Sequence, residues 1–232
     1  MHLAPLALSH LPIPMNDRDI VRVMEILQGE LDRGIPPVIT RYSRKKEDPY
    51  RILIATMLSS RTADEVTEEA SERLFSLASG PQEMLRLSDE AIARAIYPVG
   101  FYRIKARYVK EISRDLLERF HGKVPRSMRD LLSLKGVGRK TANLVLTLAL
   151  DGEGICVDTH VHRISNRLGY ISTKSPAETE KALRAKLPRK YWSDYNSVMV
   201  AHGKRTCRPI SPWCSRCPVF RFCDRTGVTS SR

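Results

Sequence analysis

Hydrophobic residues recur at helical spacing near the start of the chain. The apolar positions are Ile20, Val23, Met24, Leu27 and Leu31. Asn16 or Asp17 can cap a helix with this apolar face, and Gly34 marks its end. The segment YRILIATMLSS, which begins at Tyr50, is instead apolar on nearly all sides. This pattern is typical of a helix at the centre of a domain.

Further amphipathic segments follow, joined by short connections. Two of them have the apolar positions Val66, Ala70, Leu74 and Leu77, and Ile104, Tyr108, Ile112 and Leu116. Other helices are expected in SDEAIARAI, VPRSMRDLLSL, RKTANLVLTLAL, VHRISNRLG, SPAETEKALRAKL and YWSDYNSVMVAHG. No segment shows sustained alternation with period two, so the sequence predicts an all-α protein of about ten helices.

The charge of the chain is strongly positive. It has 39 lysines and arginines against 26 aspartates and glutamates, a net charge of +13. This favours nucleic acid as the partner, although a charge that serves only solubility is the alternative. No run approaches the roughly 18 apolar residues of a membrane span. Residues 1–16 lack a secretory signal, so we expect a disordered extension and a cytoplasmic protein, nucleoid-associated in a prokaryote.

The segment LSLKGVGRKTANLVLTLAL has two glycines at the mouth of a long apolar helix. In a hairpin of two helices, Gly136 and Gly138 can adopt backbone angles closed to other residues. The amides of this turn, which includes Val137, would then point outward toward a phosphate. Lys135 and Arg139 add positive charge, which predicts a clamp on a DNA backbone. A glycine C-cap followed by an ordinary helix start is the alternative.

Lys140 lies in the first turn of the second hairpin helix. The helix dipole and the neighbouring Arg139 destabilise its charged form, and a neutral amine can form a Schiff base with a sugar carbon. Asp158 follows that helix, where a carboxylate can assist deprotonation and stabilise positive charge on deoxyribose. The alternative is a solvated lysine and an aspartate that only caps the next helix. The capping role is expected in either case.

Four of the five cysteines crowd into CRPISPWCSRCPVFRFC. They are Cys207, Cys214, Cys217 and Cys223. Their spacing on loop-like sequence predicts a metal centre, either zinc or an iron-sulfur cluster. Cys156 stands apart between apolar neighbours and is expected to be a buried thiol. Basic residues near the cysteines could line a second phosphate contact: Lys204, Arg205, Arg208, Arg216 and Arg221.

The motifs LKGVGRKTANLVL and VDTHVHRISNRLG, followed by the cysteine run, resemble the endonuclease III family of helix-hairpin-helix DNA glycosylases and AP lyases from about residue 17 onward. The resemblance implies a six-helix barrel of roughly residues 42–152, with the hairpin at about 127–150. Residues 17–41 and 153–232 would form a second helical domain that holds a 4Fe-4S cluster. Damaged double-stranded DNA would lie in the cleft between the two domains, and we expect a monomer without membrane association.

Site residues can be carried over from the family motif by motif. Lys140 matches the Schiff-base lysine, Asp158 the catalytic aspartate, and the four cysteines the cluster ligands. MLSSRTADEVT matches the segment that fills the gap left by an extruded base, with Arg61 in place of glutamine. VGFYRIKA matches the loop that wedges into the duplex, with Phe101 where leucine is common; a core position is its alternative. His160 is expected to be structural or to face a phosphate.

The leading prediction is a bifunctional enzyme that excises oxidised or damaged pyrimidines and nicks the strand 3′ to the abasic site by β-elimination. Lys140 is the discriminating residue, because relatives that only excise bases usually lack it. A mismatch- or purine-directed glycosylase is the first alternative, which Arg61 keeps open. The second is a non-catalytic DNA-binding module. A zinc-dependent hydrolase lacks support, because a four-cysteine site has no open position for water.

Overall fold

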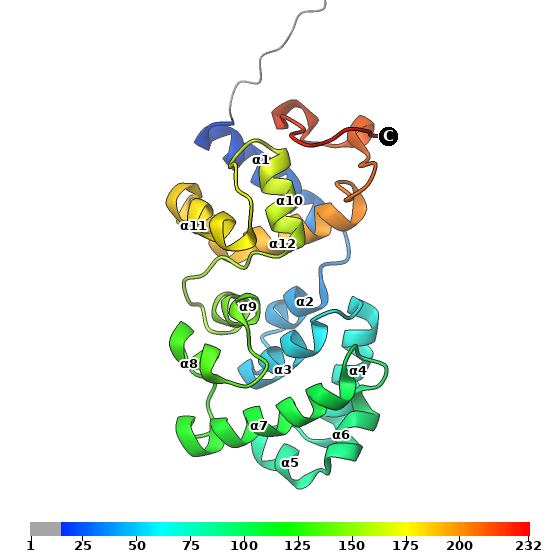
Figure 1. Cartoon of the computed structure of the whole chain (residues 1–232), viewed down its shortest axis with the longest axis vertical. Coiled ribbons are helices and arrows are strands. Elements are labelled where there is room, and N and C mark those ends of the chain that lie inside the picture. The colour runs from blue at the N-terminus through cyan, green and yellow to red at the C-terminus, as the bar shows by residue number, and fades with distance from the viewer. Residues whose placement is uncertain (1–14) are drawn as a thin grey trace, which may run out of the picture.

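The structure of the chain is a computed structural model that describes residues 15–232 (Figure 1). Twelve α-helices and three 3₁₀ helices make up the regular structure of these residues, and no strand occurs among them. None of these helices is long and apolar enough to cross a membrane. The all-α prediction is confirmed. Two helices exceed the predicted ten, because α2 (Val38–Arg44) and α5 (Pro81–Arg86) are too short to show a periodic pattern.

The lower half in Figure 1 surrounds α3 (Pro49–Ser59), which is buried along almost its whole length as its sequence predicts. The other helices of this half are α4 (Asp64–Leu77), α5, α6 (Asp89–Ile96), α7 (Tyr102–Phe120), α8 (Met128–Ser133) and α9 (Arg139–Ala149). Their buried side chains form one hydrophobic core, which runs from Tyr50 to Leu150 along the chain. We call this half the barrel.

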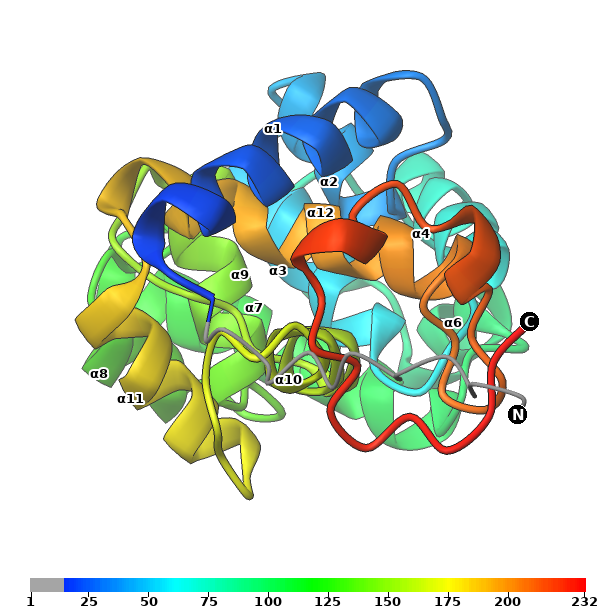
Figure 2. The same cartoon turned by 90° about the horizontal axis from the view of Figure 1, so that it is seen from above.

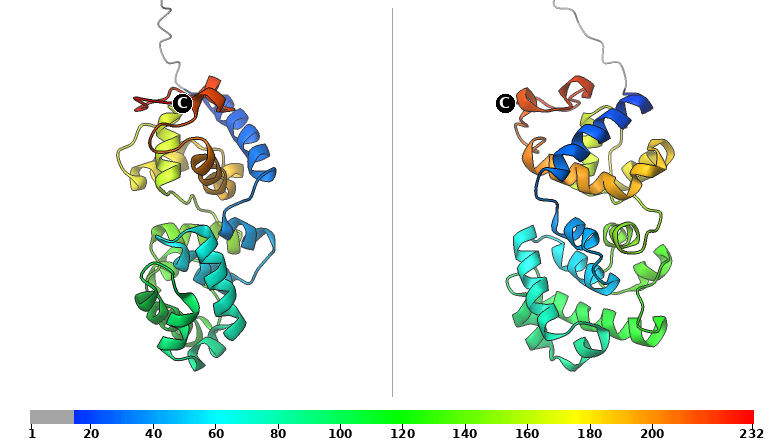
Figure 3. Two further views of the ribbon diagram at one scale, coloured as in Figure 1. Left: turned by 90° about the vertical axis from the view of Figure 1, so that its right-hand side faces the viewer. Right: turned by 180° about the vertical axis from the view of Figure 1, so that it is seen from behind.

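The upper half combines the beginning of the chain with its end. It contains α1 (Asp17–Asp32), α10 (Thr159–Arg167), α11 (Pro176–Lys186) and α12 (Trp192–Arg205), with 3₁₀ helices at Arg189–Tyr191, Cys214–Arg216 and Phe220–Phe222. Helix α1 lies beside α12 although most of the chain separates them in sequence (Figures 2 and 3). A second core, from Met15 to Val219, joins these helices. We call this half the cysteine domain.

Two predicted boundaries near the start of the chain need correction: the end of the N-terminal extension at residue 16 and the start of the barrel at residue 42. The expected disordered extension lies outside the described residues up to residue 14, but Met15 is 3% exposed and packs in the core of the cysteine domain. Asn16 caps α1 by accepting from the amides of Arg18 and Asp19. The predicted boundary after residue 41 falls inside α2, which packs against α3 and α9 through a third apolar cluster. Residues 38–41 therefore belong with the barrel.

Two apolar positions expected on buried helix faces are exposed. Ile104 is 47% exposed and Leu77 is 54% exposed. A spacing of exactly four residues drifts around a helix of 3.6 residues per turn, so Ile104 lies well away from the buried Leu116 on α7. The buried face of α7 instead passes through Val109 and Lys105.

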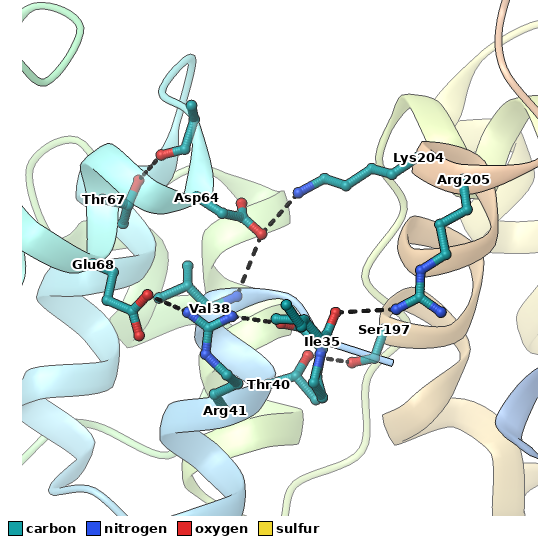
Figure 4. A network of polar contacts seen from close by, with 12 residues as sticks. Ile35, Val38, Thr40, Arg41, Asp64, Thr67, Glu68, Ser197, Lys204 and Arg205 are labelled. Carbon is teal, nitrogen blue, oxygen red and sulfur yellow. Dashed lines mark hydrogen bonds and ion pairs between the residues drawn. The ribbon is translucent and has the colours of Figure 1, made fainter. Parts of the chain in front are cut away.

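Polar contacts join the two halves beside residues 33–37, the linker between α1 and α2 (Figure 4). The hydroxyls of Thr40 and Ser197 lie 2.8 Å apart and are buried. Asp64 Oδ2 accepts from Lys204 Nζ on α12 at 2.7 Å and from the amide of Val38 at 3.4 Å. These bonds run from α4 and α2 of the barrel to α12 of the cysteine domain, so specific polar pairs set how the halves face each other.

Candidate active site

A cleft of about 870 Å³ lies between the barrel and the cysteine domain. Its walls come from α2, the turn after α3, the hairpin before α9, the start of α10, and α12. The predicted site residues that line it are Arg61, Gly136, Gly138, Lys140, Asp158, His160 and Lys204. Segments from both halves of the molecule thus converge on one opening.

Lys140 and Asp158 face each other across this cleft. The distance from Lys140 Nζ to Asp158 Oδ2 is 3.9 Å. The lysine side chain is 55% exposed, whereas the aspartate side chain is 10% exposed. Asp158 Oδ1 accepts from the amides of His160 and Val161, both at 2.9 Å, and so caps α10. The two carboxylate oxygens therefore have separate tasks: one holds the helix, and the other faces the lysine.

The start of α9 presents open amide groups toward the same cleft. Gly138 is its N-cap and supplies no side-chain hydrogen bond. The amides of Arg139, Lys140 and Thr141 occupy the first turn, where an α-helix offers no backbone partner. Such a helix start binds anions through its N–H groups and its dipole. Lys135 is exposed on the hairpin beside it.

The two hairpin glycines differ in conformation. Gly136 has a φ of +76°, and a Cβ there would lie 2.4 Å from the ring of Tyr108, so both the backbone angle and the close approach require glycine. Gly138 has a φ of −91° and a ψ of 175°, and a Cβ would meet nothing within 4 Å. The expectation that Gly138 needs special backbone angles is wrong, because its extended conformation is open to any residue.

Val137 is a core residue of the hairpin. Its side chain is 6% exposed and packs in the barrel core. Its amide donates to the carbonyl of Leu134 at 3.2 Å. The predicted role of Val137 in phosphate binding therefore needs correction: its amide closes the turn and is not free to bind an anion.

Arg139 is also engaged within the protein. Its Nε and Nη2 donate to the two carboxylate oxygens of Glu180 on α11, at 2.7 and 2.9 Å. Arg184 Nε donates to the same carboxylate at 3.1 Å. Burial alone would raise the pKa of Glu180, but the hydrogen bonds from the two arginines outweigh it and lower this pKa. The guanidinium of Arg139 thus links the hairpin to α11, which corrects its predicted role as a DNA clamp. No sequence signal pointed to Glu180.

The basic residues near the cysteines do not form one patch. Lys204 lines the cleft. Arg205 donates to the carbonyl oxygens of Glu30 at 3.1 Å and Ile35 at 3.4 Å, so it fixes the end of α1 and the linker. Its predicted contact with phosphate is corrected accordingly, because its donors face the protein backbone. Arg208 is exposed on the loop that follows α12.

His160 is partly buried at the base of the cleft. Burial lowers the pKa of His160 despite the nearby Asp158, and the cations of Arg163 and Lys204 lower it further. Its Nδ1 lies 3.1 Å from Arg163 Nη2. A neutral imidazole that contacts an arginine fits the structural role predicted for His160 rather than a cationic contact with phosphate.

Arg61 and Phe101 lie together at the edge of the cleft. Both have left-handed backbone angles, with φ values of 54° and 59°. Phe101 is 58% exposed, so the alternative of a core position is wrong. The guanidinium carbon of Arg61 is 5.6 Å from the centre of the Phe101 ring, which is within cation–π distance.

The four clustered cysteines line one pocket between α10, α12 and the C-terminal loop. Arg167 Nη1 lies 3.5 Å from Cys207 Sγ, and His202 Nε2 lies 3.8 Å from Cys217 Sγ. An arginine N–H beside sulfur, such as that of Arg167, is typical of the surroundings of metal-bound thiolates. Burial raises the pKa of Cys217 to about 11 and that of Cys223 to about 12. These sulfurs therefore stay protonated near neutral pH unless a metal replaces the proton.

The two metal alternatives differ in how closely they need these thiols to approach one another. Zinc needs its ligand sulfurs at about 2.3 Å from a single point. Within residues 15–232, no three histidine, cysteine or carboxylate side chains are grouped closely enough to hold one ion. A 4Fe-4S cluster binds one cysteine per iron and so spreads its four thiolates over a larger volume. Four cysteines that line one pocket are a donor set that such a cluster could use. Cys156 is buried and separate, as predicted.

Residues 54–189 match the family of HhH-GPD superfamily base excision DNA repair proteins. The chain is 47% identical over 189 residues to the endonuclease III of Thermotoga maritima, a match that covers 81% of this chain and 89% of that one. It is 44% identical over 177 residues to the endonuclease III-like protein 1 of Bos taurus. That match covers 75% of this chain and 58% of the longer bovine protein.

Solved structures show the same relationship. A trapped endonuclease III–DNA covalent intermediate, in a complex with an estranged adenine, has a TM-score of 0.79 with this chain. The two are 30% identical, over 91% of this chain and 97% of the other. The chain therefore belongs to the endonuclease III family, within the HhH-GPD superfamily of base excision DNA repair proteins.

Proposed function

We propose that Lys140 and Asp158 excise damaged pyrimidines from double-stranded DNA and then cleave the strand. As a member of the endonuclease III family, the chain is a base excision repair DNA glycosylase and AP lyase. The observation that carries the assignment of residues is the 3.9 Å between the amine of Lys140 and the carboxylate of Asp158 at the wall of the cleft. A primary amine beside a carboxylate supplies the nucleophile and the proton acceptor that Schiff-base chemistry needs.

The reaction follows from these two groups. The neutral amine of Lys140 attacks C1′ of an extruded nucleotide, and the glycosidic bond breaks with its electron pair leaving on the base. Asp158 Oδ2 accepts the proton that the lysine must lose and stabilises the positive charge that develops on the sugar. The sugar ring opens to an imine, loss of a C2′ proton expels the 3′ phosphate, and hydrolysis of the imine returns the free lysine.

DNA binding would use several groups around the cleft. The open amides at the start of α9, together with Lys135, suit a backbone phosphate next to the damaged nucleotide. Arg61 would enter the gap left by the extruded base, which its position in the lining of the cleft supports, and Phe101 would wedge between neighbouring bases, which its exposure supports.

We also propose a resident 4Fe-4S cluster on Cys207, Cys214, Cys217 and Cys223, which the shared pocket and the N–H of Arg167 support. When bound, the cluster supplies iron–thiolate bonds that hold the C-terminal loop against α10 and α12. No reaction step in this proposal uses it. Iron and acid-labile sulfide analysis of the purified protein, with the visible absorbance of the cluster, tests this assignment; stoichiometric zinc without sulfide would contradict it.

Borohydride trapping tests the catalytic assignment. Reduction of the imine should fix the enzyme covalently to a duplex that contains thymine glycol. The Lys140→Gln variant should give no adduct, whereas Lys123→Gln, an exposed lysine at the far end of α7, should give as much as the unmodified protein. An unchanged adduct in the Lys140→Gln variant would sink the assignment.

Arg61 favours a second candidate, a mismatch-directed glycosylase. The family pattern has glutamine where this chain has arginine, and Arg61 lines the cleft, where it can contact the orphan base. Single-turnover excision should be compared on thymine glycol opposite adenine and on thymine opposite guanine. Faster excision from the mismatch would replace the proposed damaged-pyrimidine substrate by the mismatch.

A further inference from the structure

Lys105 is a buried lysine in the first turns of α7. It is 6% exposed, and no carboxylate of residues 15–232 lies within ion-pair distance of it. Its Nζ donates to the carbonyl oxygens of Leu58 at 2.8 Å and Ser60 at 2.6 Å, and lies 3.4 Å from the hydroxyl of Thr62. Burial lowers the pKa of Lys105 to about 8. Burying a lysine without a carboxylate partner is costly, so its position calls for a reason.

The partners of Lys105 lie where α3 ends. The carbonyls in the last turn of an α-helix lack amide partners, and a cation there also interacts favourably with the helix dipole. Lys105 therefore caps the C-terminus of α3 from another helix. It also fixes the course of residues 60–62, the turn that follows.

This turn carries Arg61 and contacts the loop that carries Phe101. The amide of Gly100 donates to the hydroxyl of Thr62 at 3.2 Å. A Cβ at Gly100 would lie 2.7 Å from the carbonyl oxygen of Arg61, so the two backbones touch. The amide of Lys105 donates to the carbonyl of Phe101 at 3.0 Å. Lys105 thus holds the turn of residues 60–62 through its side chain and the loop that carries Phe101 through its backbone amide.

We propose that Lys105 is a positioning residue that keeps Arg61 and Phe101 together as one unit for nucleotide extrusion. The inference rests on the proposed function, in which these two side chains enter the duplex. Extrusion requires both side chains to arrive at the same base step, and a turn already held in place avoids the entropy of ordering it during binding. Lys105 itself touches neither the sugar nor the base.

The test measures extrusion separately from chemistry. In a Lys140→Gln background, the fluorescence of 2-aminopurine opposite a thymine glycol reports opening of the base pair. We expect Lys105→Met to reduce the amplitude or rate of the fluorescence rise at least fivefold at saturating DNA. Lys110→Met is the matched control, because Lys110 lies on the same helix and pairs with Asp89 away from the turn.

A second pair of measurements separates positioning from damage to the catalytic pair. In otherwise unmodified protein, Lys105→Met should lower kcat on duplex thymine glycol at least fivefold. Strand cleavage at an abasic site in single-stranded DNA, which needs no extrusion, should change less than twofold. Lys105→Arg, which keeps a cation, should recover part of the duplex activity.

Several outcomes would overturn the inference. One is an equal fluorescence rise in the Lys105→Met and Lys110→Met variants, and another is an equal loss of activity on duplex and single-stranded substrates. If Lys105→Met does not fold, Thr62→Val breaks the contact with Gly100 while the lysine stays in place, and a fluorescence rise unchanged by it would also overturn the inference. If the Lys140→Gln parent shows no rise on any lesion, the proposed function fails instead.

Discussion

At the scale of single residues, Asp158 caps a helix and is also the proposed proton acceptor. Its Oδ1 caps α10 through two amides, while Oδ2 faces Lys140. The capping bonds fix the carboxylate, so the distance to the lysine does not depend on a free rotamer. Substitutions can separate these tasks because asparagine keeps the capping oxygen but loses the charge.

Asp158→Asn should abolish most activity with little effect on stability. Asparagine caps helices about as well as aspartate, whereas loss of the proton acceptor should slow single-turnover excision by about 10²- to 10⁴-fold. Asp158→Ala should lose activity equally and in addition lower the free energy of unfolding by about 1 kcal/mol. Excision assays and denaturant titrations of both variants check this. Equal destabilisation by the two substitutions would contradict the separation of roles.

Gly136→Ala should destabilise the hairpin by about 1–3 kcal/mol. Alanine at a φ of +76° is strained, and its Cβ would meet the ring of Tyr108. The matched control is Gly138→Ala, whose Cβ has open space, and it should change stability by less than about 1 kcal/mol. Denaturant titration of both variants distinguishes the two glycines, and equal effects would be evidence against the requirement for glycine at position 136.

At the scale of elements, the hairpin is held in place by a helix that lies later in the sequence. Glu180 on α11 is 4% exposed and accepts from Arg139 and Arg184. This bond network joins the start of α9, which carries Lys140, to the cysteine domain. The position of Lys140, the proposed nucleophile, therefore depends on both halves of the molecule.

Glu180→Gln should lower the free energy of unfolding by about 1–3 kcal/mol at pH 7, because the three hydrogen bonds from the charged Arg139 and Arg184 weaken. The folded pKa of Glu180 is lowered, so the stabilisation by its carboxylate is complete above the unfolded pKa of about 4.3. It is lost as the pH falls below that value through the folded pKa. Denaturant titrations from pH 7 to pH 3 should show the difference between wild type and variant shrinking at the acid end. A difference independent of pH would assign the effect to packing instead.

At the scale of the whole molecule, the net charge of +13 acts together with the cleft. Positive charge attracts any duplex without reading its sequence, and in the proposed function the cleft between the halves selects a nucleotide that has left the helix. Several basic side chains are nevertheless paired inside the protein, as Arg139 and Arg205 show. The net charge therefore overstates how many cations can meet phosphates.

Binding to undamaged duplex should weaken steeply with salt. Each phosphate contact contributes close to one unit to the slope of log K against log salt, so Lys135→Ala should reduce the slope by about 1. Arg205→Ala should leave the slope nearly unchanged, because its guanidinium donates to the backbone carbonyls of Glu30 in α1 and Ile35 in the linker. Fluorescence anisotropy at several salt concentrations measures both, and an equal change in the two variants would contradict the assignment of Arg205.

Much of the fold and of the reactive chemistry could be predicted from local patterns. Helical periodicity identified ten of the twelve helices, and missed only two of six and seven residues. The hairpin motif, Lys140, Asp158 and the cysteine spacing are short-range signals, because each depends on residue types at fixed separations along the chain. Capping of α10 by Asp158 was predictable for the same reason.

Only the tertiary structure decided which charged side chains and backbone amides remain available to bind DNA. Arg139 donates to Glu180, Arg205 donates to carbonyls of α1 and the linker, and the Val137 amide donates within its own turn. Each of these bonds depends on a partner that folding brings close. The sequence by itself determined that the protein is all-α and that Lys140, Asp158 and the four clustered cysteines are the candidate site residues. The packing of distant helices determined the cleft, the 3.9 Å between Lys140 and Asp158, and the buried ammonium of Lys105 that joins two loops, because such contacts leave no pattern along the chain.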